Sequence, residues 1–224
     1  MEKKDFILTA ADYNAISLND MHFINNKGAA LYKEDTYYES VEYYRLASAM
    51  GDSHATSNLG YCNLYGRSIE QNLSLAIAYF KIAAMKKDVD AAYKLGDIYG
   101  SDKWGIKDSE ISVYYYTKAA EFLTGSDSVY CDVYDCRDLQ IYPSLCFALG
   151  REMLPGGNMS TDIETAYQYL KHAEIGYERE LANGGNMYKN AYSGVVKLIE
   201  DNIFDDIREK YDDLFSEEDD FYID

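Results

Sequence analysis

The stretch that decides the fold is LAIAYFKIAA, residues 75–84, which returns thirty-six residues later as ISVYYYTKAA, residues 111–120. The text before it repeats with the same offset, since NLG at 58–60 returns as KLG at 94–96. A constant offset over two separated stretches predicts a repeat protein. Small and apolar residues recur at helical spacing in each half of both copies, so each unit is predicted to be two short antiparallel helices. Such a pair does not bury its apolar face alone, and neighbouring pairs must stack.

Two more units follow the same pattern once the spacing varies. In the first, Tyr44 and Ala47 stand thirty-six residues before Phe80 and Ala83, and the loop between its two helices is shorter. The fourth is delayed by an insertion. The predicted organisation is a lead-in or cap at 1–25, repeats at about 26–51, 54–87, 90–123 and 142–176, an insertion at 124–141, capping helices at 177–215 and an acidic tail at 216–224.

Glycine recurs inside the predicted first helices, at Gly60, Gly96 and Gly150. A helical glycine costs about 1 kcal/mol relative to alanine, so each must be offset by a contact that a side chain would prevent. Alanines of the second helix alternate with large residues such as Phe80 and Tyr116, which favours interlocking layers. The sequence therefore predicts a close approach of the helices at these glycines.

The units resemble Sel1-like repeats, of the tetratricopeptide-repeat-like superfamily. The resemblance rests on A-x3-LG in the first helix, a turn glycine, and a closing A-x2-[YF][YFL]-x2-A[AE]; the residues are Ala55, Leu59, Gly60, Ala91, Leu95, Gly96, Gly66, Gly105 and Gly156. The first repeat is closer to a tetratricopeptide repeat, and Asn63 of the second repeat stands where the family usually has tyrosine. The resemblance implies an all-α fold, a right-handed α-solenoid of helical hairpins (an alpha-alpha superhelix).

Charge restricts the classes of partner. Lys and Arg total 21 against 39 Asp and Glu, a net charge of −18 that opposes binding to nucleic acid or to an anionic membrane. Residues 200–224 hold twelve acidic and two basic residues, hence −10 of that total. No run approaches the roughly 20 apolar residues of a membrane span, and Asp5 and Asp12 interrupt the beginning before any signal-peptide core. We expect a cytoplasmic protein, although a removed signal peptide would not be visible, and the oligomeric state stays open.

Motifs of catalysis and of cofactor binding are not found in the sequence. It has no G-x-G-x-x-G, Walker A, H-E-x-x-H, G-x-S-x-G or S-x-x-K motif, and His22, His54 and His172 are scattered. His172 is interpreted as a surface or seam substitution rather than a general base. We therefore predict that the protein is not an enzyme and holds no cofactor.

The four cysteines do not recur at a fixed repeat position, so no disulfide framework is expected. Cys62 and Cys146 are interpreted as buried small apolar groups. Cys131 and Cys136 leave a small disulfide or a metal site open, but they have no neighbouring histidine and no C-x2-C pair. Asp132, Asp135 and Asp138 in the insertion lack the spacing of a calcium loop. No metal site is predicted.

The resemblance implies a function in protein–protein interaction, as an adaptor whose concave groove, lined by the first helices, binds a protein or peptide segment. Asparagine and aspartate pair with backbone amides, and lysine and arginine with a carboxylate. The 24 tyrosines exceed what the helix seams need, so some rings must meet solvent or a ligand. The predicted groove residues are Tyr32, Asn58, Tyr61, Asn63, Lys94, Asp97 and Arg151.

Two alternative functions remain open. The first is binding or hydrolysis of a small molecule or cell-wall fragment, because some cysteine-rich Sel1-like proteins are associated with β-lactam binding. The missing cysteine pattern and nucleophile motif argue against it. The second is that the acidic tail mimics nucleic acid and binds a basic partner.

Overall fold

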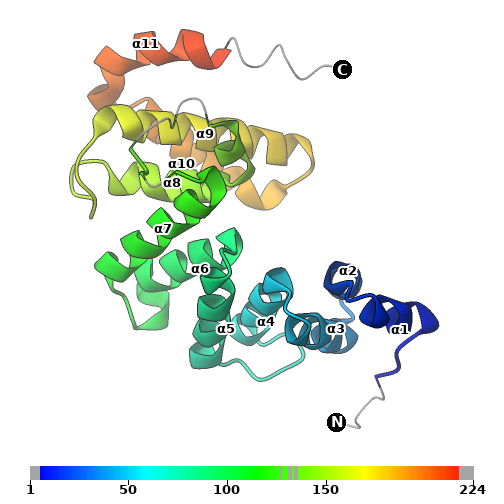
Figure 1. The fold of residues 1–224 in the computed structure, drawn as a ribbon. Helices are drawn as coiled ribbons and strands as arrows, with labels where there is room; N and C mark the ends of the chain where they lie inside the picture. Colours follow the sequence, from blue (N-terminus) through cyan, green and yellow to red (C-terminus); the bar gives the residue numbers. More distant parts are fainter. Residues whose placement is uncertain (1–5, 127, 131–132, 134–135, 217–224) are drawn as a thin grey trace. The chain divides into compact units, whose positions relative to one another are not determined.

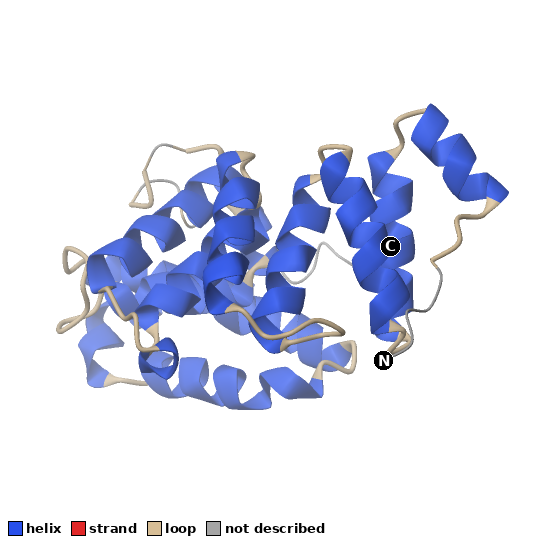
Figure 2. Ribbon diagram, turned by 90° about the horizontal axis from the view of Figure 1, so that it is seen from below, coloured by secondary structure: helices blue, strands red, loops and turns tan. Residues whose placement is uncertain are grey.

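The computed structural model describes residues 6–126, 128–130, 133 and 136–216, and these residues form helices, turns and loops without a strand (Figures 1 and 2). The all-α prediction is confirmed for this part of the chain. None of the described helices has the length and apolarity that a bilayer-spanning segment needs. The chain divides into two compact units, residues 1–106 and residues 107–224, which are described separately.

The first unit is a series of helices that each pack against the next along the chain. A short helix precedes two complete hairpins and the first helix of the third repeat. In order these are α1 (Ala10–Ser17), α2 (Met21–Lys33), α3 (Tyr37–Ala49), α4 (Ser53–Tyr65), α5 (Leu73–Met85), α6 (Val89–Gly100) and the 3₁₀ turn η1 (Asp102–Trp104).

Every first helix of this unit begins at an aspartate. The side chains of Asp20, Asp52 and Asp88 accept a hydrogen bond from the backbone N–H three residues further on, which satisfies one of the free donors of a helix N-terminus. Because Asp20 sets the start of α2, this helix begins five residues before the first predicted repeat. The loop between α4 and α5 is four residues longer than the loop between α2 and α3. It begins at Gly66, whose φ of 68° is in the left-handed region that glycine adopts most readily.

The predicted close approach at glycine occurs in the α4–α5 hairpin, and the α2–α3 hairpin has one of the same kind. A Cβ placed on Gly60 of α4 would lie 2.7 Å from the ring of Phe80 on α5. Gly28 of α2 meets the ring of Tyr44 in the same way, with 2.9 Å to the nearest ring carbon. The two helices of a hairpin therefore touch through a glycine on the first helix and a large side chain on the second. Gly28 stands eight residues after the cap Asp20, as Gly60 stands eight residues after the cap Asp52, so the two glycines correspond.

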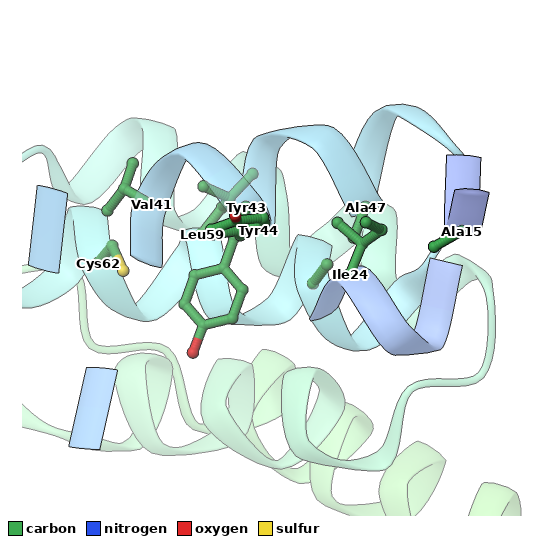
Figure 3. Close-up of a cluster of buried hydrophobic side chains, with 9 residues drawn as sticks. Ala15, Ile24, Val41, Tyr43, Tyr44, Ala47, Leu59 and Cys62 are labelled. Atoms are coloured by element: carbon green, nitrogen blue, oxygen red, sulfur yellow. The ribbon is translucent and has the colours of Figure 1, made fainter. Parts of the chain in front are cut away.

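Buried side chains from α1 to α4 form a common core (Figure 3). Val41, Tyr44 and Leu59 point into it together with Cys62, whose burial agrees with its interpretation as a small apolar group. Its other members are Ala15, Ile24, Tyr43, Ala47 and Ala55. Burial of such residues from successive hairpins supplies the stability that a single hairpin lacks.

The helix α1 is fastened to this core by one ionised carboxylate. Asp12 is fully buried, and its oxygens accept hydrogen bonds from Lys27 Nζ of α2 at 2.7 and 2.8 Å and from the Tyr43 hydroxyl of α3 at 2.8 Å. The Thr9 backbone N–H also donates to it, at 2.7 Å. Burial alone would raise the pKa of Asp12, but the hydrogen bonds from Lys27, Thr9 and Tyr43 outweigh it and lower the pKa to about 2.

The second unit repeats the hairpin once and then departs from it. Helix α8 packs against α9, with a Cβ on Gly150 placed 2.9 Å from Leu170, as at Gly60 and Phe80. The fully buried Cys146 of α8 agrees with its interpretation as a small apolar group. In order the elements are α7 (Ser109–Thr124), the 3₁₀ turn η2 (Arg137–Ile141), α8 (Pro143–Glu152), α9 (Ile163–Ala182), η3 (Asn186–Tyr188), α10 (Lys189–Ile199), η4 (Asn202–Phe204) and α11 (Asp205–Ser216).

The described part of the insertion covers one face of α9. Val129, Val133 and Leu139 are buried. The Tyr169 hydroxyl donates to the Val129 carbonyl at 3.1 Å, and His172 Nε2 lies 2.6 Å from the Val133 carbonyl. His172 is therefore a buried residue at the seam with the insertion. Cys131, Asp132, Asp135 and residues 217–224 of the predicted acidic tail lie outside the described residues.

Candidate functional site

The first helices of the first unit carry a connected line of polar and aromatic side chains. The Asn58 side-chain amide of α4 donates to Asn25 Oδ1 of α2 at 3.1 Å. One repeat further on, Lys94 Nζ of α6 lies 5.7 Å from the centre of the Tyr61 ring of α4. Asn58 and Lys94 both stand six residues after the capping aspartate of their helix, so corresponding positions of successive repeats make these two contacts. We call Asn25, Asn58, Tyr61, Lys94 and Asp97 the first-helix strip.

Lys94 is held by three neighbours. Its Nζ lies 2.7 Å from Asp97 Oδ2, and 5.2 Å from the ring centre of Tyr93 in addition to its contact with Tyr61. Two aromatic faces and one carboxylate leave the ammonium little freedom. Because Lys94 and Asp97 are only partly exposed, their ion pair is a prearranged donor and acceptor rather than two mobile surface charges.

Tyr61 is the aromatic centre of the strip. Its ring meets Phe80 edge-on at 5.0 Å and stacks on the exposed Tyr65 at 6.3 Å. Burial raises the pKa of Tyr61 well above its ordinary value, and the carboxylates of Asp90 and Asp97 add to this. The phenol therefore stays protonated at neutral pH and keeps a hydrogen to donate.

Asn58 has groups to spare for a ligand. Its side-chain amide carries two hydrogens, and one of them is directed at Asn25. The remaining hydrogen and the side-chain carbonyl are one donor and one acceptor, the pair that a peptide bond needs in reverse order. Since Asn25 is buried and fixes the amide from below, Asn58 presents this pair in one orientation.

The structure brings four of the seven predicted groove residues together, namely Asn58, Tyr61, Lys94 and Asp97. Tyr32 lies instead at the end of α2, where its ring meets Tyr37 edge-on at 5.0 Å. Arg151 belongs to the second unit, where its guanidinium lies over the Phe147 ring at 5.6 Å.

Asn63 is placed differently from the position that we predicted. It is 4% exposed, and its side-chain amide donates to the Leu59 carbonyl at 2.8 Å. Two residues on a helix of 3.6 residues per turn are about 200° apart, so Asn63 faces away from Tyr61. Its backbone carbonyl accepts from Asn72 N–H at 2.9 Å, which ties the end of α4 to the start of α5. Asn63 therefore serves the loop and is left out of the strip.

Sequence reasoning missed two features of this surface. Asn25 has no asparagine as its counterpart in the other repeats, because Ser57 and Tyr93 stand five residues after the capping aspartates Asp52 and Asp88, and only its bond to Asn58 identifies it. The second feature is a pocket of about 320 Å³ beneath the α4–α5 loop, which the four-residue difference in loop length could have signalled. It is lined by Arg45, Leu59, Asn63, Ile69, Glu70, Gln71, Asn72, Leu75 and Tyr79.

Comparison with known proteins gives one family and one fold. The family model of the Sel1 repeat matches residues 26–52, 53–88, 89–121 and 143–173, so the predicted resemblance is confirmed. The crystal structure of a Sel1 repeat protein from Oxalobacter formigenes is similar, with a TM-score of 0.54 over 90% of this chain and 89% of that chain. Its sequence identity of 18% makes this a likeness of fold. A search of curated proteins gave no match.

Proposed function

The chain belongs to the Sel1-repeat family, and we propose that it is an interaction module whose first-helix strip binds a peptide segment of a partner protein. Sel1 repeats generally mediate protein–protein interactions, and the family is typically a scaffold without enzymatic activity. The observation that carries the proposal is the linkage of Asn58 to Asn25 and of Lys94 to Tyr61, which arranges donors, acceptors and a ring in one line along successive repeats.

Prearrangement is the physical reason to choose this surface. Binding orders side chains at a cost of about 0.5–1.5 kcal/mol for each flexible side chain that becomes fixed. Lys94 is already held by Asp97 and Tyr61, and Asn58 is already held by Asn25. A ligand at the strip therefore meets groups that lose little further freedom.

The chemistry of the strip indicates an extended segment rather than a single charged group. Asn58 offers a donor and an acceptor to one peptide bond, and Tyr61 with Tyr65 offers an aromatic surface to a side chain. The ion pair of Lys94 and Asp97 suits a polar or charged side chain of either sign. The net charge of −18 favours segments from neutral or basic partners.

Selection of displayed peptides on the full chain tests the proposal, with counter-selection on the Asn58→Ala, Lys94→Ala double variant. We expect enriched peptides whose Kd, measured by fluorescence anisotropy, rises at least about tenfold in the double variant. Circular dichroism checks that the variant keeps its helices.

Two matched variants sharpen this experiment. Ile82→Ala changes an exposed residue on the second helix α5 and should leave the Kd unchanged. Arg151→Ala tests the predicted contribution of Arg151 to the Kd. Peptides that bind the wild type and the double variant equally well would exclude the strip as the binding surface.

The alternatives stay predictions. The acidic mimic depends on residues 216–224, and a partner that is lost when this tail is removed would support it. Binding or hydrolysis of a β-lactam-like compound would be shown by a stable adduct or by turnover of a labelled penicillin, and neither is expected of an interaction module.

A further inference from the structure

A histidine of one repeat meets the capping aspartate of the next at the N-terminal ends of the first helices. Asp52 caps α4 through Oδ1, and His22 Nδ1 of α2 lies 2.9 Å from its Oδ2. Asp88 caps α6 through Oδ1, and His54 Nδ1 of α4 lies 2.9 Å from its Oδ2. The two contacts are copies of each other, with both aspartate side chains buried.

The two copies differ in the residue that follows the capping aspartate by two positions. Two residues after its capping aspartate, α6 carries Asp90, whereas α4 carries His54 and α2 carries His22 at that position. Ligand atoms of His54, Asp88 and Asp90 all lie within 4.8 Å of one another. Among the residues that the structure describes, no other three His, Cys, Asp or Glu side chains come as close.

The surroundings of Asp88 indicate that a positive charge, on a proton or a cation, stabilises this cluster. It is 3% exposed, and its Oδ2 is buried without a hydrogen bond, facing His54 Nδ1. Without a proton on Nδ1, two lone pairs would oppose each other at 2.9 Å, and Asp90 adds a second carboxylate. Either a proton or a cation relieves this.

We propose that His54 Nδ1, Asp88 Oδ2 and a carboxylate oxygen of Asp90 bind a divalent first-row transition-metal ion. One imidazole nitrogen and two carboxylates are a donor set that suits Zn²⁺ and its neighbours. Two ligand atoms about 2.1 Å from one ion lie roughly 3.0–3.4 Å apart at angles of 90–110°, close to the separation of His54 Nδ1 and Asp88 Oδ2. Water completes the coordination, because the His54 side chain is 58% exposed.

The bound ion would tie the second repeat to the third. His54 stands on α4, and both aspartates stand at the start of α6. Asn58 and Lys94 of the first-helix strip lie about one turn further along the same two helices. A metal at the helix starts would therefore fix the spacing of the strip, without taking part in a reaction.

Zn²⁺ titration of the metal-stripped full chain tests the proposal, followed by calorimetry and by NMR of the histidine ring nitrogens. The protein carries Cys131→Ser and Cys136→Ser, so that these thiols do not bind zinc. We expect one equivalent to bind, with the His54 Nδ1 resonance shifted and that of His22 unchanged. Asp90→Asn should weaken binding at least about tenfold, whereas His22→Ala, at the copy without a third ligand, should leave the Kd within twofold.

Several outcomes would overturn the site. Zn²⁺ that binds with equal affinity in Asp90→Asn, or that leaves the His54 resonances in place, is held by the acidic surface in general. Zn²⁺ binding that is found with Cys131 and Cys136 in place, and is lost when both are replaced by serine, belongs to the insertion. Absence of any heat or resonance shift up to millimolar Zn²⁺ leaves the protonated His54–Asp88 ion pair as the whole role of the cluster. Circular dichroism of Asp90→Asn verifies its fold.

Discussion

The second helices α5 and α9 have the same repeat pattern and opposite surroundings. Counted from their capping residues, Ile82 of α5 and His172 of α9 stand at the same position, yet Ile82 is 47% exposed and His172 is fully buried. The apolar residue faces solvent and the polar one is covered. Repeat position therefore determines which residues face the partner helix, but it does not determine what lies over the outer face.

The insertion accounts for the difference. Its backbone carbonyls at Val129 and Val133 accept hydrogen bonds from Tyr169 and His172 of α9. In the first unit the corresponding connection, from α3 to α4 ahead of the α4–α5 hairpin, has three residues, and Leu75 and Ile82 of α5 are exposed. A polar residue is stable at the covered position because a carbonyl faces it, whereas an apolar residue at the open position costs little.

The largest test of this comparison places lysine at the shared position. His172→Lys buries a charge that the Val133 carbonyl alone does not compensate, and we expect the free energy of unfolding to fall by about 3–5 kcal/mol. Ile82→Lys places the same charge in solvent and should change it by less than about 0.5 kcal/mol. Urea unfolding followed by circular dichroism measures both. Equal losses would mean that the insertion does not cover α9 in solution.

A second test lowers the pH, because the packing of α1 on the core of the first unit depends on the Asp12 carboxylate. The pKa of Asp12 is about 2 in the folded chain and 3.8 for the free group. Its contribution of roughly 2 kcal/mol is therefore present above pH 4 and is lost as the pH falls towards 2. The fluorescence of Trp104, in the same unit, reports unfolding there.

Asp12→Asn is the control for the acid experiment. It should destabilise the first unit at pH 7, because Lys27 loses its buried partner. It should also remove most of this unit's dependence on pH between 4 and 2. A variant with the same acid dependence as the wild type would show that other carboxylates are responsible.

A third test addresses the contact that α5 and α9 share. Gly60→Ala puts a Cβ 2.7 Å from the Phe80 ring, and we expect a net loss of about 1–2 kcal/mol after the helix propensity of alanine is counted. Gly150→Ala meets the flexible Leu170 at 2.9 Å and should lose less. Thermal unfolding compares them. Phe80→Leu in the Gly60→Ala background should recover part of the loss, and a further loss would contradict the contact.

The smallest test removes single hydroxyls. Tyr169→Phe deletes the bond to the Val129 carbonyl and should cost about 1 kcal/mol, because that carbonyl is then left without its donor. Tyr79 stands at the same position of α5, and Tyr79→Phe should be close to neutral. If Tyr79→Phe destabilised the protein as much, the hydroxyl of Tyr169 would not be what holds the insertion.

The repeat pattern predicts the contacts that recur and misses those that occur once. The contact of Gly60 with Phe80 has a counterpart in the contact of Gly150 with Leu170, so this close approach follows from the sequence. The orientation of Asn63 does not, because the family pattern gives a residue type there and the helix angle decides which way it faces. The cover of His172 comes from an insertion that has no counterpart in the other repeats.

The candidate site shows the same division. Four predicted residues of the strip come together because the first helices of successive repeats run side by side, which the repeat implies. The contacts of His22 with Asp52 and of His54 with Asp88 join residues 30 and 34 apart in sequence. Such pairs depend on the register between neighbouring hairpins, and no local pattern of the sequence reports that register.

The glycine on each first helix has a consequence for how such a chain can change. The space beside it is left by a missing side chain rather than shaped to fit one partner, and it accepts Tyr44, Phe80 or Leu170 alike. The packing between the two helices is therefore determined within each hairpin. Whole hairpins can be exchanged, added or removed without redesign of their internal packing, so the length of the array is free to vary while each module stays sound.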